Sequence, residues 1–150
     1  MRSEDAIDAP EALVLTMVLV SAADGGITDR EIGIMSALVQ TLPAFQDFTK
    51  EALADVTERA VDLLHDDDGL AHAARLMRAA LKPKLRETAY AFACEVVAGG
   101  QGARRQSLDM LDFVRGELGL DQLVSAAIER GVRARYQRVE APDLSDRGEA

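Results

Sequence analysis

The chain has 150 residues, of which 48% are apolar, and its 26 Asp and Glu against 17 Lys and Arg give a formal charge of −9. This length suits one domain with its own core, and the apolar fraction excludes a chain that is disordered throughout. The single cysteine excludes an intrachain disulfide framework and a thiolate zinc site, and the acidic balance disfavours nucleic acid as a partner.

No targeting segment is expected. The longest apolar stretch, residues 12–20, is far shorter than the roughly 20 residues that a membrane-spanning helix needs. The residues before it include Glu4, Asp5, Asp8 and Glu11, whereas a signal peptide begins with basic residues. We therefore expect no transmembrane segment, a cytoplasmic location, and a helix over this stretch that is buried on nearly all sides.

Helical spacing of apolar residues dominates, and no segment alternates with the period of a strand. Pro10 and Pro83 suit first helical turns, Gly25 and Gly26 end a helix, and residues 28–31 form the capping-box pattern S/T-x-x-E. These signals predict an all-α, single-domain bundle with N-terminal and C-terminal tails over residues 1–9 and 139–150. Its seven helices are expected over residues 10–23, 29–42, 45–64, 71–81, 83–98, 104–118 and 122–138. The C-terminal tail, with Leu144 as its one aliphatic anchor, is expected to be mobile.

An internal repeat is also predicted. The helix–turn–helix unit of residues 10–42 can be laid over residues 82–118, with an offset of 75 before the turn and 76 after it. After the turn, apolar residues then fall on apolar residues: Ile32, Ile34, Met35, Leu38 and Leu42 on Leu108, Met110, Leu111, Val114 and Leu118. Gene duplication explains this pattern, and so does the ease with which amphipathic helices superpose.

The first turn, Ala22-Ala23-Asp24-Gly25-Gly26-Ile27-Thr28-Asp29-Arg30-Glu31, fits the signature A-x-D-G-x-[IL]-[ST]-x-x-E. In this motif and in its duplicated layout over residues 10–138, the sequence resembles the TerB family of bacterial tellurite-resistance proteins. The resemblance implies a pseudo-two-fold fold of about seven helices and a non-enzymatic role in responses to toxic oxyanions, phage and colicins. It further implies a protein complex with membrane-bound Ter-type partners and, as in some members, divalent cations bound by acidic residues.

Asp24, Asp29 and Glu31 are the candidate metal ligands, for a divalent cation such as Ca²⁺, Mn²⁺ or Zn²⁺. The alternative is structural, since the same acids can cap the following helix and close the turn. In the second copy both signature carboxylates are lost, and Arg104 and Arg105 stand nearby. If the two turns meet, these arginines are expected to pair with the acids of the first turn in place of a metal.

Charge is unevenly distributed, since residues 1–75 carry 15 acidic and 5 basic side chains and residues 76–150 carry 11 and 12. Four arginines lie near the end of the last predicted helix: Arg130, Arg133, Arg135 and Arg138. They either complement the helix dipole and pair with Glu129 and Glu140, or bind an acidic partner or anionic lipid.

Other polar residues favour structural roles. One Asp of residues 66–68 is expected to cap a helix, His65 and His72 are spaced wrongly for a metal pair, and Cys94 is expected to be buried and inert.

Three functions remain open from the sequence. The first is the non-enzymatic stress-response protein of the resemblance, which binds cations or charged partners at the acidic turn. The second is a helical scaffold with no ligand function. The third is a small metal-dependent hydrolase that uses Asp24, Asp29 and Glu31 as ligands, which is disfavoured because the turn holds no His, Lys or Tyr for proton transfer.

Overall fold

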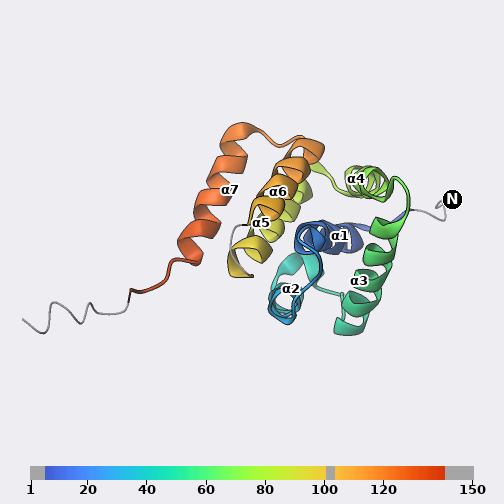
Figure 1. Ribbon diagram of the computed structural model, residues 1–150, viewed down its shortest axis with the longest axis horizontal. Coiled ribbons are helices and arrows are strands. Elements are labelled where there is room, and N and C mark those ends of the chain that lie inside the picture. The colour runs from blue at the N-terminus through green and yellow to red at the C-terminus, as the bar shows by residue number, and fades with distance from the viewer. Residues whose placement is uncertain (1–5, 101–103, 141–150) are drawn as a thin grey trace, which may run out of the picture.

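The structure is a computed structural model that describes residues 6–100 and 104–140. In this part of the chain all regular structure is helical, and the prediction of an all-α, single-domain fold with seven α-helices is confirmed (Figure 1). The helices are α1 (Ala9–Ala22), α2 (Asp29–Thr41), the 3₁₀ helix η1 (Pro43–Phe45), α3 (Lys50–His65), α4 (Gly69–Ala80), α5 (Pro83–Gly99), α6 (Arg105–Leu118) and α7 (Gln122–Arg135).

Helix starts follow local side-chain chemistry. Thr28 and Glu31 form the predicted capping box of α2, and Asp8 and Glu11 form a second one at α1. Asp121 accepts a hydrogen bond from the Leu123 N–H at 2.8 Å and so caps α7 as predicted. These caps use backbone donors that the first helical turn leaves without a partner.

Two predicted boundaries are wrong. The third helix does not begin at residue 45, because Thr49 accepts a hydrogen bond from the Ala52 N–H at 3.1 Å and starts α3 at Lys50. Phe45 lies instead in η1, buried and stacked on Phe92 with ring centroids 5.6 Å apart. The last helix ends at Arg135 and not near residue 138. The tail residues 141–150, including Leu144, lie outside the described residues.

The core is built around α1 and α5, which pack against each other at the centre (Figure 1). Every residue of α1 from Ala12 to Ser21 is buried, as predicted, because α3, α4, α5 and α6 all pack on this helix. The helix α5 is covered by α1, α2, α6 and α7. None of the described helices is both long enough and apolar enough to cross a membrane.

The helix contacts have an approximate two-fold arrangement. The helix α2 packs on α5 and α6 packs on α1, while α3 packs on α1 and α7 packs on α5. Exposure follows the same correspondence, since Ile32 of α2 and Leu108 of α6 are each 46% exposed. The helix α4 and the 3₁₀ helix η1 have no counterpart among the described helices.

Candidate functional site

The acidic turn after α1 meets the end of α5 and the start of α6. Arg30 donates a hydrogen bond from Nε to the Gly99 carbonyl oxygen at 2.9 Å. Arg104 Nη1 lies 3.8 Å from Asp24 Oδ2, which confirms the predicted pairing of the second turn's arginines with the first turn's acids for this residue. The two turns approach closely, because a Cβ on Gly100 would lie 3.1 Å from Glu31 Cγ, which is tighter than ordinary van der Waals contact.

The Glu31 carboxylate is engaged by its own helix. Its Oε1 accepts hydrogen bonds from the Thr28 N–H and the Thr28 hydroxyl, both at 2.9 Å. The Glu31 N–H in turn donates to Thr28 Oγ1 at 3.1 Å. This buried acid therefore stabilises the start of α2.

Asp29, the third candidate ligand, is exposed in the first turn of α2, where the helix dipole favours an acid. Asp24 and Glu31 are thus engaged by Arg104 and Thr28, and Asp29 lies at the surface. Within residues 6–100 and 104–140, no three His, Cys, Asp or Glu side chains are placed to hold a metal ion. Cation binding at the acidic turn stays a prediction.

The other residues singled out from the sequence lie at helix ends or in ion pairs between helices. Asp68 occupies the N-cap position of α4, but the predicted capping bond is absent because its backbone is left-handed, with φ of 58°. Arg135 pairs with Glu95 at 2.6 Å, not with the expected Glu129 or Glu140. Glu129 is instead approached by Arg115 of α6, whose Nη1 lies 3.9 Å from Glu129 Oε2.

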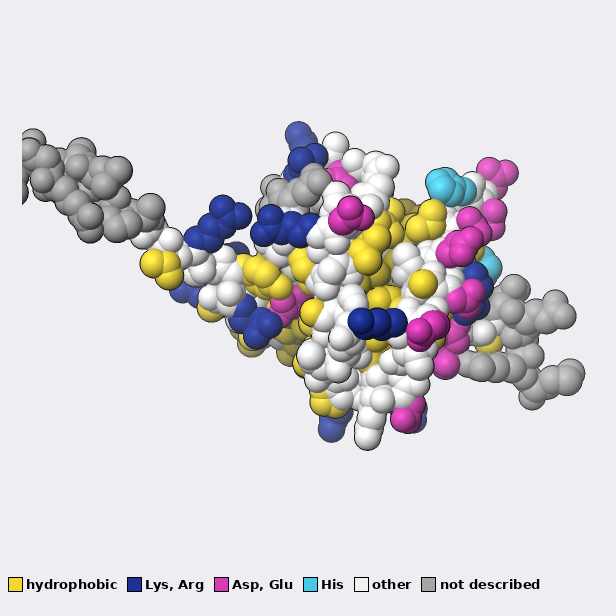
Figure 2. Space-filling model, turned by 90° about the horizontal axis from the view of Figure 1, so that it is seen from below, with side chains coloured by type: hydrophobic (Ala, Val, Ile, Leu, Met, Phe, Trp, Pro, Cys, Tyr) yellow, Lys and Arg dark blue, Asp and Glu magenta, His cyan; other side chains and the backbone are white. Residues whose placement is uncertain are grey.

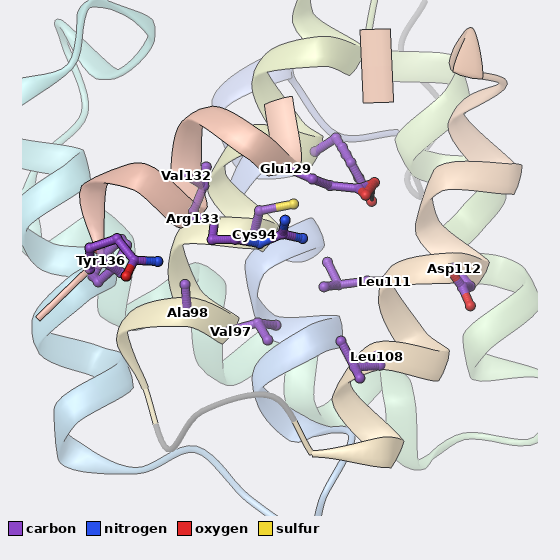
Figure 3. Close-up of a pocket in the computed structure, with 12 residues that line it drawn as sticks. Cys94, Val97, Ala98, Leu108, Leu111, Asp112, Glu129, Val132, Arg133 and Tyr136 are labelled. Carbon is purple, nitrogen blue, oxygen red and sulfur yellow. Dashed lines mark hydrogen bonds between the residues drawn. The ribbon is translucent and has the colours of Figure 1, made fainter. Parts of the chain in front are cut away.

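A groove lies between α6 and α7 with α5 as its floor, and its cavity volume is about 480 Å³ (Figure 3). We call it the α6–α7 groove. Its apolar lining includes Val97 of α5, Leu108 and Leu111 of α6, and Val132 of α7. This groove was not predicted from the sequence, in which its only local signal is an apolar residue, Leu108, one turn after two arginines.

One end of the α6–α7 groove is closed by a polar network. The Tyr90 hydroxyl of α5 donates to Glu129 Oε2 of α7 at 2.7 Å. Arg115 bridges that carboxylate to Asp112 on α6, at 3.0 Å from Asp112 Oδ1. Burial, reinforced by the hydrogen bond to Glu129, raises the pKa of Tyr90 well above its usual value. The network joins the three helices α5, α6 and α7.

Cys94 lies in the groove floor and is expected to react slowly with thiol reagents. Burial raises the pKa of its thiol to about 12, with a smaller contribution from the negative charges of Glu129 and Glu95. Since the thiolate is the nucleophile, the reaction at pH 8 should be roughly a thousandfold slower than that of free cysteine. Ellman's reagent measures this rate in native protein, and guanidinium-unfolded protein is the control. Equal rates in the two states would contradict it.

Alkaline pH is expected to destabilise the fold. Burial, followed by a hydrogen bond to Glu95, raises the pKa of Tyr136 to about 12, above the ordinary value for tyrosine. The fold therefore favours the neutral phenol, and this stabilisation is complete below pH 10 and lost as the pH rises toward 12. The melting temperature, followed by circular dichroism, should fall over this range, and less steeply in Tyr136→Phe. Identical slopes would contradict the assignment.

Together, the fold and the site define an all-α domain. In it, the acidic turn after α1 contacts the start of α6, and an apolar groove lies between α6 and α7. Comparison of the chain with models of protein families, with curated proteins and with solved structures finds no match.

Proposed function

We propose that this chain is a non-enzymatic stress-response protein, resembling the TerB family, that acts by binding other proteins. The observation that carries this proposal is the α6–α7 groove, whose rim holds Leu108 with 46% of the residue exposed. An apolar groove with polar borders is typical of a surface that another protein covers. The polarised charge of the chain suits a binding role in which a partner recognises one side of the molecule.

The test is complementation under stress. In a strain that lacks the gene, we expect the native chain to restore tolerance to tellurite and Leu108→Glu to fail, because the new charge would repel an apolar partner surface. Leu123→Glu is the matched control, since Leu123 is 81% exposed on α7 and does not line the groove. Equal tolerance with the native chain and Leu108→Glu would count against protein binding at this surface.

Cation binding at Asp24, Asp29 and Glu31 is the second part of the proposal. Calorimetric titration with Ca²⁺, Mn²⁺ and Zn²⁺ tests it on the native protein and on Asp24→Asn/Glu31→Gln. A heat that the double variant lacks would support the site, and equal heats would discard it. Arg104→Gln adds a sharper comparison, because Arg104 competes for Asp24 and its removal should tighten any cation binding.

The two alternative functions make different predictions in the same assays. A scaffold without ligand function would show neither a cation heat nor a phenotype for Leu108→Glu. A metal-dependent hydrolase would show a metal-stimulated turnover that Asp24→Asn abolishes.

A further inference from the structure

We propose that the α6–α7 groove binds an amphipathic helix of a partner protein, with acidic residues flanking the apolar face of that helix. This inference rests on the proposed protein-binding function and names the place and the chemistry of the contact.

The groove is shaped for the apolar side chains of a helix. The helices α6 and α7 each pack on α5 but make at most slight contact with each other. Residues of α5 therefore line the bottom of the groove between them. Figure 3 shows Leu108 and Leu111 on one side, Val132 and Tyr136 on the other, and Val97 and Ala98 between them. A helix in such a groove presents anchors spaced three or four residues apart.

The rim of the groove is basic. Arg133 lines the groove, Arg105 lies one turn before Leu108 on α6, and Arg130 lies one turn before Arg133 on α7. All three are exposed, and none forms an ion pair with another described residue. Figure 2 shows Lys and Arg gathered around apolar side chains at the end of the molecule from which the C-terminal segment leaves.

The acids within the groove do not cancel this charge. Asp112 and Glu129 both lie within ion-pair distance of Arg115, and Glu129 also accepts the Tyr90 hydrogen bond. Arg115 balances only one of these two carboxylates, but Arg105, Arg130 and Arg133 outnumber the one that remains. The net charge around the groove is therefore positive, and it complements carboxylates on an incoming helix. The helix dipole and the Glu95 pair account for Arg135, and the dipole also favours Arg133 in the last turn of α7. Arg105, Arg130 and Arg133 still have no ion-pair partner among the described residues.

The corresponding groove of the first half is an internal control. It lies between α2 and α3, with a cavity volume of about 380 Å³, and contains Ile32, the counterpart of Leu108. There α2 and α3 pack directly on each other, and the charged lining consists of Lys50 and Glu58, which balance. This groove has an exposed aliphatic residue without the basic rim.

The experiment is selection from a displayed library of helical peptides that carry leucines on one face and varied charges on its flanks. We expect peptides selected on the native protein to have acidic flanks. Leu108→Glu and Arg105→Glu/Arg133→Glu should each lower their recovery at least tenfold, while the matched controls Ile32→Glu and Arg75→Glu should leave it unchanged. The charge-reversed double variant should select basic flanks instead, a compensation that misfolding would not produce.

Three results would overturn the inference: no enrichment, enrichment without an acidic bias, or enrichment that survives Leu108→Glu. A fourth would be the absence of peptide enrichment together with arginine-dependent binding to phosphatidylglycerol vesicles that is insensitive to Leu108→Glu, since the arginines would then serve a lipid surface. Loss of stress tolerance in Leu108→Glu without an acidic bias would leave the proposed function standing and reject the partner chemistry. An acidic bias without a stress phenotype for Leu108→Glu would support the partner chemistry and reject the proposed stress-response function.

Discussion

Replacing Leu13 by Ala is expected to lower the free energy of unfolding by about 2–5 kcal/mol. Leu13 is 1% exposed and lies in α1, the helix that four others cover. Truncation removes apolar contacts and leaves a cavity that rigidly packed neighbours fill only in part. Chemical denaturation followed by far-UV circular dichroism measures the change.

The matched control for this truncation is Leu123→Ala on α7. Leu123 is 81% exposed, so the same chemical change should alter stability by no more than about 0.5 kcal/mol. Comparable losses in the two variants would mean that α1 is not the buried centre of the fold.

Replacing Gly69 by Ala is expected to destabilise the protein by about 1–3 kcal/mol or more. A Cβ on Gly69 would collide with the backbone carbonyl oxygen of Leu63 at the end of α3. That oxygen accepts a hydrogen bond from the Asp66 N–H at 3.1 Å, and the Gly69 N–H donates to Asp66 at 3.0 Å, so the turn cannot move freely. The melting temperature and the denaturant midpoint should both fall.

Gly116→Ala within α6 is the control for this substitution, and it should have the opposite sign. A Cβ there meets no atom within 4 Å, and Ala is a better helix former than Gly by about 1 kcal/mol. Helix propensity alone predicts that both substitutions stabilise, so a gain in Gly69→Ala would show that the turn between α3 and α4 is looser than described.

The helices could largely be predicted because their signals are local. Capping residues such as Thr28 and Asp121, and Pro83 in a first turn, act within a few residues of the helix they start. The error at Phe45 arose because Phe45 and Phe48 keep helical spacing with the residues that follow, although the Thr49 cap separates them from α3. Apolar spacing marks which residues are buried and does not mark where the chain breaks.

Only the part of the site that involves the two turns of the repeat could be predicted from the sequence. Aligning the two turns predicted that Arg104 and Arg105 would pair with the acids of the first turn, and Arg104 does lie within ion-pair distance of Asp24. The α6–α7 groove gave no comparable signal, because it depends on how α5 separates two helices that are each amphipathic in the ordinary way. Exposure of Leu108 is a tertiary property, and in the sequence this residue resembles any other member of an apolar stripe.

The central position of α1 also bears on how the chain acquires its structure during synthesis. This helix precedes the other described helices in the chain, yet two of the helices that cover it, α5 and α6, begin only at Pro83 and Arg105. The part of its apolar surface that α5 and α6 cover therefore stays exposed until those two helices have been made, and exposed apolar surface at that stage promotes aggregation. The two halves are consequently interdependent: neither can complete its core without the other, and a nascent chain that stops before α5 leaves its most apolar helix partly exposed.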